Sequence, residues 1–247
     1  ILDEIKCDIG IIGVAEIVIN CILKTDLKNE KELSKIKGIV YKQNNKIKIS
    51  NPPKDKYNIE NLPIPNRELA FLEDYIEVRS ILTSRGCINK CDFCPTSNYW
   101  GMWRARSAKN VVNAIEYLIN NYGTKKIIFL DDNMTVNLKR MQDISNLILE
   151  KKLNIKLGCL ASINTYEKET FSLMYKAGFR WVHFGIESGS QKVLKNNNKN
   201  FDINYAKKVI KEVKKIGYRV RTSFIFDLPT TTKEDMKQTT QFILETE

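Results

Sequence analysis

The stretch Thr83-Ser-Arg-Gly-Cys87-Ile-Asn-Lys-Cys91-Asp-Phe-Cys94-Pro95 holds three of the six cysteines of the chain. Their spacing lets three thiolates surround one face of a compact metal centre. Structural zinc takes a fourth ligand, usually a nearby Cys or His, but the single histidine, His183, is remote and the sequence has no second cysteine pair. Three thiolates suit a cubane iron–sulfur cluster in which one iron stays open. The plain alternative is a chance group of core cysteines, although the flanking Gly86 and Pro95 favour a loop.

This Cys-x3-Cys-x2-Cys pattern, with an aromatic residue before the last cysteine, resembles the signature of the radical S-adenosylmethionine (radical SAM) enzymes. The flanking strings Thr83-Ser-Arg-Gly-Cys87 and Phe93-Cys94-Pro95 are similar to that family's first strand and loop. The resemblance implies that Cys87, Cys91 and Cys94 hold a [4Fe-4S] cluster whose open iron binds S-adenosylmethionine (SAM). It also implies an enzyme that cleaves SAM reductively to a 5′-deoxyadenosyl radical.

Apolar strands and periodic helices alternate after the cysteines. Strands are predicted at residues 79–83, 126–130, 155–161, 181–186 and 218–226, and helices between them and from residue 233. This alternation predicts an α/β fold, with a parallel sheet covered by helices and curling towards a barrel. The resemblance implies a partial (β/α)6 barrel of which about five βα units are present, so we expect a fragment.

The first 66 residues follow a different pattern. A strand is predicted at 8–13, a helix at 15–23 and a hairpin at 37–49 with Asn44-Asn45 at its turn, before the linker Leu62-Pro63-Ile-Pro65. This order resembles the trailing edge of the Rossmann-like cobalamin-binding domain that precedes the barrel in one branch of the family. We therefore divide the chain into a domain remnant with hairpin and linker at 1–66 and a radical SAM core at 67–247.

Polar residues follow two of the predicted strands, at the end where such barrels build their sites. Asp131 and Asp132 end the second strand, and Glu187 and Ser188 end the fourth. By resemblance, the aspartates meet the methionine amino group of SAM, Glu187 and Ser188 meet its ribose or methionine end, and Phe93 lies near the adenine. Polar turns without a ligand are the ordinary alternative.

Composition places the chain in the soluble globular class, with 43% hydrophobic and 28% charged residues. The net charge of +11 would suit nucleic acid, but most of the surplus is Lys, beside many Asn and Ile, as AT-rich coding produces; nucleic acid is not expected. With no apolar run long enough to span a bilayer and no signal peptide, we expect a cytoplasmic protein with reduced thiols. Cys7, Cys21 and Cys159 stand singly in apolar stretches and are expected to be buried.

The leading hypothesis is a radical SAM enzyme of the cobalamin-associated branch. It would use a [4Fe-4S] cluster, SAM and, in a longer parent protein, cobalamin to methylate or rearrange a small molecule or lipid. An electron donor such as flavodoxin or ferredoxin would serve it. One alternative is a methylthiotransferase acting on tRNA or protein, which shares the cysteine loop and the basic-aromatic stretch from Trp100 to Arg106. Another is a non-catalytic module with zinc on the cysteines and nucleic acid on the basic surface.

Overall fold

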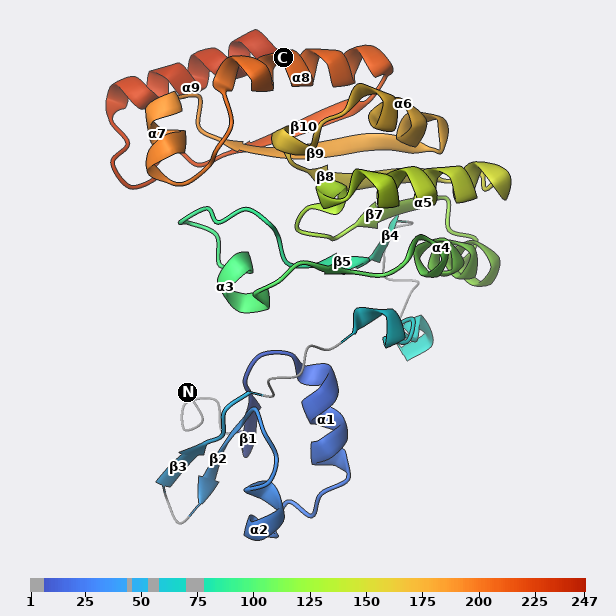
Figure 1. Ribbon diagram of the computed structural model, residues 1–247, viewed down its shortest axis with the longest axis vertical. Coiled ribbons are helices and arrows are strands. Elements are labelled where there is room, and N and C mark those ends of the chain that lie inside the picture. Colours follow the sequence, from blue (N-terminus) through green and yellow to red (C-terminus); the bar gives the residue numbers. More distant parts are fainter. Residues whose placement is uncertain (1–6, 44–45, 53–57, 70–77) are drawn as a thin grey trace. The chain divides into compact units, whose positions relative to one another are not determined.

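The computed structural model describes residues 7–43, 46–52, 58–69 and 78–247. Contacts divide the chain into two compact units, Ile1–Asn58 and Ile59–Glu247, drawn in Figure 1. The predicted division after residue 66 lies further along the chain than this one. None of the helices in the described ranges is both long and apolar enough to cross a membrane.

The first unit is a small antiparallel sheet with two helices. Its elements are β1 (Ile9–Ile11), α1 (Ala15–Leu23), α2 (Glu30–Leu33), β2 (Ile39–Gln43) and β3 (Lys46–Ile49). The strand order is β1-β2-β3, and Val18 of α1 packs with Ile39 and Tyr41 of β2. The predicted helix and hairpin are confirmed, whereas the predicted Asn44-Asn45 turn lies outside the described residues. The prediction that Cys21 is buried is wrong, because this position on α1 faces solvent.

The second unit is built on a five-stranded parallel sheet. Its strands are β4 (Val78–Ile81), β7 (Lys126–Phe129), β8 (Lys156–Ala161), β9 (Phe179–Glu187) and β10 (Arg219–Phe224). The order β10-β9-β8-β7-β4 pairs each strand with the next strand of this sheet along the chain, as in a singly wound barrel. The predicted α/β fold, a partial barrel with five strands, is confirmed.

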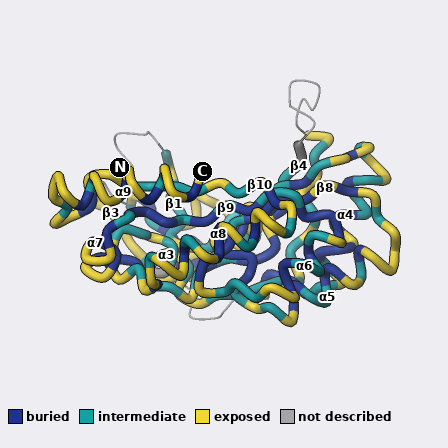
Figure 2. Tube along the Cα trace, turned by 90° about the horizontal axis from the view of Figure 1, so that it is seen from above, coloured by how far each residue is buried: buried dark blue, intermediate teal, exposed yellow. Residues whose placement is uncertain are grey.

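Five long helices follow one another around this sheet. They are α4 (Ala108–Tyr122), α5 (Leu138–Glu150), α6 (Lys168–Lys176), α8 (Ile203–Ile216) and α9 (Lys233–Thr246), and each contacts the next. Ser107 caps α4 by accepting a hydrogen bond from the Asn110 backbone at 3.1 Å, as its place before the periodic stretch predicts. Buried and exposed residues alternate along these helices (Figure 2), as expected of amphipathic helices with one face on the sheet.

The remaining elements of the second unit are short. They are the 3-10 turns η1 (Ile59–Asn61), η2 (Arg67–Leu69), η4 (Met134–Val136) and η5 (Ile163–Thr165), the strands β5 (Ser84–Arg85) and β6 (Arg104–Ala105), and the helices α3 (Thr96–Trp100) and α7 (Gln191–Asn196). Sequence periodicity predicts none of them, because two to six residues carry too little pattern.

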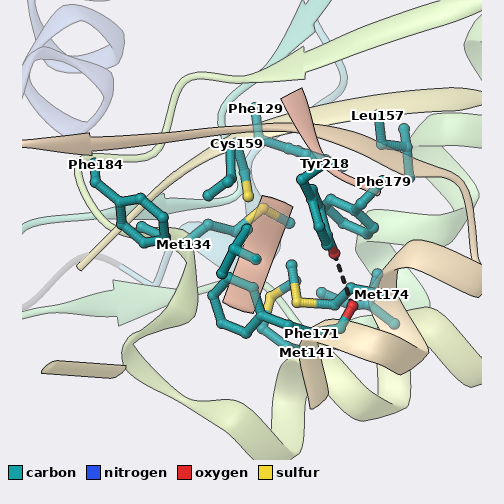
Figure 3. Close-up of a cluster of buried hydrophobic side chains, with 14 of the residues drawn as sticks. Phe129, Met134, Met141, Leu157, Cys159, Phe171, Met174, Phe179, Phe184 and Tyr218 are labelled. Carbon is teal, nitrogen blue, oxygen red and sulfur yellow. Dashed lines mark hydrogen bonds between the residues drawn. The ribbon is translucent and has the colours of Figure 1, made fainter. Parts of the chain in front are cut away.

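The core fills the space between the sheet and the helices. Figure 3 shows its aromatic centre, where the Tyr218 hydroxyl donates a hydrogen bond of 2.8 Å to the Phe171 carbonyl. Alternate strand residues such as Leu157, Cys159 and Phe184 belong to this core, which confirms the burial predicted for Cys159. The strand residues between them lie on the opposite face of the sheet.

Candidate functional site

The cysteine loop runs between β5 and β6, which pair antiparallel. At its start, Gly86 has φ +87°, and a Cβ there would lie 2.8 Å from the carbonyl oxygen of Met102 near the loop's end. The two ends of the loop therefore touch backbone to backbone, an approach and a φ that glycine permits.

A second segment holds the loop from the side of α7. The backbone N–H of Asp92 donates to the Asn197 carbonyl at 3.2 Å, and the Asn198 amide donates to the Asp92 carboxylate at 2.7 Å. This contact joins residues more than a hundred positions apart. It brings the turn after α7, with Lys199, to the cysteines.

A cavity of about 270 Å³ lies against the loop, at the carboxyl ends of β7 to β10. It brings together six of the predicted site residues, Cys87, Cys91, Cys94, Phe93, Asp132 and Glu187. It is also lined by further polar residues, among them Asn133, Ser162, His183 and Lys199. Strand ends and the cysteine loop thus form one site, as the parallel sheet predicts.

Asp131 lies behind this cavity and does not line it. The residue is fully buried, and its carboxylate accepts hydrogen bonds from the Thr83 backbone at 2.6 Å, the Thr83 hydroxyl at 2.5 Å and the Ser84 hydroxyl at 2.6 Å. These bonds fix the chain where it enters the cysteine loop. Because Asp131 is buried outside the cavity and bonded to Thr83 and Ser84, the structure shows it as an anchor of the loop.

Asp132 both lines the cavity and ties the loop. Its carboxylate accepts from the backbone N–H of Gly86 at 3.1 Å and from the Thr96 hydroxyl at 3.2 Å. These two donors stand on either side of the cysteines. The remaining acceptor capacity of the carboxylate can meet an ammonium group of a ligand.

A buried guanidinium also holds the two ends of the cysteine loop. Arg140 of α5 donates to the Arg106 carbonyl at 2.7 Å, and to the Thr83 hydroxyl at 2.8 Å and carbonyl at 3.2 Å. Burial lowers the pKa of Arg140, and the negative charge of Asp131 opposes that shift. Thr83 is therefore held by both an anion and a cation, in a network shut off from solvent.

Glu187 and Lys199 form an ion pair on the cavity wall. Their charged atoms are 3.4 Å apart, and the two side chains are 12% and 16% exposed. Glu187 has φ +70°, a conformation that non-glycine residues seldom adopt and that gathers at functional sites. The Lys199 ammonium also lies 5.9 Å from the centre of the Phe93 ring.

Lys199 is the site residue that the sequence does not reveal. It follows three consecutive asparagines, a polar turn with no spacing relation to the cysteines. Burial raises the pKa of the Cys91 thiol, and the positive charge of Lys199 opposes this shift. A cation here stabilises thiolate character beside it.

Ser188, predicted to contact SAM, does not line the cavity. It is buried, and its hydroxyl lies 3.3 Å from the Thr239 hydroxyl of α9 and accepts from the Ser190 backbone at 3.1 Å. The backbone turns at Glu187, which sends the next side chain towards α9.

Two buried nitrogens on the cavity have no hydrogen-bond partner within the described part of the chain. They are Nδ2 of Asn133 and Nε2 of His183. Burial lowers the pKa of His183, and the positive charge of Arg221 lowers it further. Unpaired buried polar atoms cost free energy, so atoms of this kind at a cavity wall fit a polar ligand.

The donor set around the loop fits an iron–sulfur cluster. No three His, Cys, Asp or Glu side chains in the described residues converge on the position of a single metal ion. A cubane is held by thiolates that bind separate irons, so three thiols spread along one cavity wall match its needs. The adjoining cavity, with two orphaned nitrogens and an ion pair, suits a charged organic cofactor.

Comparison with known proteins gives a family match. Residues 81–243 match the family model described as the Radical SAM superfamily. At 34% identity over 221 residues, the chain is similar to an uncharacterized methyltransferase of Pyrococcus horikoshii, with 87% of this chain and 48% of that protein covered. A putative methylthiotransferase of Methanocaldococcus jannaschii is 29% identical over 266 residues, covering 100% of this chain and 55% of that protein.

A solved structure shares the fold. The cobalamin-dependent S-adenosylmethionine radical enzyme OxsB, with aqua-cobalamin and S-adenosylmethionine bound, superposes with a TM-score of 0.82 at 22% identity. That match covers 93% of this chain and 35% of the OxsB chain. The chain described here spans about half the length of the curated relatives it matches.

Proposed function

Because the chain belongs to the radical SAM superfamily, we propose that Cys87, Cys91 and Cys94 hold a [4Fe-4S] cluster and that the adjoining cavity binds SAM. The observation that carries this proposal is the single cavity that the three thiols share with Asp132, Glu187 and Lys199. When bound, the cluster would supply the electron that cleaves the SAM sulfonium to a 5′-deoxyadenosyl radical.

The side chains around the cavity divide the recognition of SAM among them. Lys199 offers an ammonium to the methionine carboxylate, and Glu187 and Asp132 offer carboxylates to its amino group. Phe93 presents an apolar ring for the adenine. Asn133 offers the N–H groups of its amide, which have no partner in the described residues.

Asp131 and Ser188 are buried outside the cavity and hold the segments that carry these residues. Asp131 holds Thr83 and Ser84, and so sets where the cysteine loop starts. Ser188 fixes the turn after β9 against Thr239 of α9. Both are therefore proposed as positioning residues and not as ligands of SAM.

The reaction proposed for the whole protein is methyl transfer to a small molecule or lipid, with cobalamin and an electron donor such as flavodoxin or ferredoxin. Its support is the resemblance of residues 1–66 to the end of a cobalamin-binding domain, the methyltransferase relative of P. horikoshii and the fold shared with OxsB. Residues 67–247 form the proposed radical SAM core. Methylthio transfer to tRNA or protein is the second candidate, favoured by the M. jannaschii relative that matches the full chain.

Anaerobic reconstitution with iron and sulfide tests the proposed centre. The chain should turn brown, bind about four irons and cleave SAM when reduced. Cys91→Ala should lose both the cluster and the cleavage. The control is Cys21→Ser, an exposed cysteine of the first unit, which should keep both. A colourless chain with stoichiometric zinc, or full SAM cleavage by Cys91→Ala, would refute the proposal.

A further inference from the structure

A second cavity, of about 510 Å³, opens on the sheet face that the helices leave uncovered. Its volume falls within the range of small-molecule sites. It shares Leu160 and His183 with the cavity beside the cysteines, so the two cavities meet at these residues. Apart from these two shared residues, its lining takes no part in the binding of cluster or SAM proposed above.

The sheet register puts the lining of this cavity in two rows. In one row, Trp181 of β9 pairs with Arg219 of β10. In the next, Leu160 of β8 pairs with His183, and His183 pairs with Arg221. Residues in register on neighbouring strands share a face of the sheet. The first row therefore places Trp181 beside Arg219, and the second places Leu160, His183 and Arg221 in line.

The charge on this lining has one sign. Lys126, Arg219 and Arg221 all line the cavity, and no Asp or Glu is among its lining residues. None of the three cations forms an ion pair with a residue of the described ranges. The positive charge of Arg221 also acts on His183, where it adds to burial in lowering the pKa of the imidazole.

We propose that this second cavity recognises an oxyanion, a phosphate or a carboxylate, carried by a substrate with a flat apolar body. Arg219 and Arg221 bind the oxyanion, because a guanidinium meets two oxygens of such a group at once. Trp181 and Leu160 receive the apolar body. Nε2 of His183, buried without a partner, is left at the border with the first cavity.

The placement has a consequence for the reaction. An anion held on β10 directs the rest of the molecule along the His183 row, towards the cavity beside the cysteines. The inference rests on the proposed function in one respect, since it makes the bound molecule the substrate of that site. It narrows the proposed small molecule or lipid to an acidic one.

Calorimetric titration of the full chain as purified, without iron, sulfide or SAM, tests this inference. The probes are phenyl phosphate, phenylacetate and the uncharged 2-phenylethanol. Both anions should bind, and the alcohol at least tenfold more weakly. Tighter binding of phenyl phosphate indicates a phosphate ester as the natural group, and tighter binding of phenylacetate indicates a carboxylate.

Two double variants, each removing two positive charges, distinguish binding in this cavity from general attraction of anions to a basic protein. Arg219→Gln with Arg221→Gln should weaken the anionic probes tenfold or more. Lys208→Gln with Lys237→Gln removes two exposed cations of α8 and α9 and should change the affinity less than twofold. The inference would be overturned if both double variants lost affinity for the anions equally. It would also be overturned if 2-phenylethanol bound as tightly as the anions, or if neither anion bound. Since no cluster is assembled, a failed reconstitution leaves this readout intact.

Discussion

Asp131 and Asp132 are neighbours in the chain, but only the second reaches the cavity. The chain bends at Asp132, just after the end of β7, so the two side chains point to different sides. Asp131 therefore points to Thr83 and Ser84 behind the cysteine loop, whereas Asp132 lines the cavity and ties Gly86. An acidic pair at the end of a strand thus combines one anchor with one residue available to a ligand.

Replacing Asp131 should destabilise the second unit strongly. Asp131→Ala leaves the buried donors of Thr83 and Ser84 unpaired and removes the anion that offsets Arg140, at a cost of about 3 kcal/mol. Chemical denaturation measures this loss. The control Asp143→Ala breaks an exposed pair with Lys139 and should cost less than about 0.5 kcal/mol. Equal stability of the two variants would contradict the anchoring role.

Gly185 offers a way to move one carboxylate without touching the fold. A Cβ at this position would overlap Oε1 of Glu187, the free end of a flexible side chain. Gly185→Ala should therefore push Glu187 away from Lys199 and weaken SAM binding roughly tenfold, with a change in the free energy of unfolding below about 1 kcal/mol. Titration with SAM and thermal unfolding measure the two effects.

A double variant shows whether Gly185→Ala acts through that carboxylate. If it does, adding Glu187→Gln should weaken SAM binding no further than either change alone. Additive losses would mean that the alanine disturbs the cavity by another route. A large fall in melting temperature would likewise contradict the argument.

The cysteines and the acidic strand ends are predictable because their local spacing carries the chemistry. Lys199 is not, because its position depends on Asp92 meeting Asn197 and Asn198 across the fold. The direction of the Ser188 side chain is not predictable from the sequence for a related reason. The positive φ of Glu187, a tertiary constraint, decides which way the next side chain points.

At the scale of elements, several hydrogen bonds and an ion pair hold the start of α9 near the site. The Asp235 carboxylate accepts from the Thr232 backbone N–H at 2.9 Å, and the Asp235 backbone N–H donates to the Thr232 hydroxyl at 3.3 Å, which makes a capping box. The same carboxylate accepts from the Ser190 hydroxyl at 2.6 Å. Lys192 lies 3.1 Å from the same carboxylate. The helix is thereby joined to the turn that follows Glu187.

These bonds predict how stability depends on pH. Hydrogen bonds from Ser190 and then Thr232 hold the pKa of Asp235 well below its ordinary value. A carboxyl whose folded pKa is depressed stabilises the fold above its unfolded pKa, about 3.9, and loses this contribution as the pH falls below it. Asp235→Asn should therefore lower the melting temperature at pH 7, and the gap from the parent chain should shrink below about pH 4. A gap that is constant from pH 7 to pH 3 would contradict this.

Long elements are predicted well because many residues repeat the same signal. The helix faces of α4, α5 and α8 and the apolar strands β7 to β9 each bury several side chains that recur at the expected period. The pair β5 and β6 has two residues in each strand. It is specified by the close approach of Gly86 to Met102, which no periodicity displays.

At the scale of the whole molecule, the boundary between the units follows contacts that local sequence does not show. The prolines at 63 and 65 predict a linker and a division after residue 66. However, the Glu60 carboxylate accepts hydrogen bonds from both the backbone N–H and the hydroxyl of Ser107 at 2.6 Å. The backbone carbonyl of Glu60 accepts from the Asn110 amide at 3.1 Å. Residues 59–66 thus reach the start of α4, and the second unit begins at Ile59.

Two truncated chains test where the second unit begins. Residues 59–247 should unfold cooperatively, because their core is separate from that of the first unit. Residues 67–247 lose the Glu60 bonds to Ser107 and the buried side chain of Ile59, about 3 kcal/mol together, or roughly 6–12 °C in melting temperature. Glu60→Ala in the longer chain should account for about 1–2 kcal/mol of this loss. If the two truncated chains melt at the same temperature, the boundary lies where the prolines predict and the contacts of Glu60 contribute no stability.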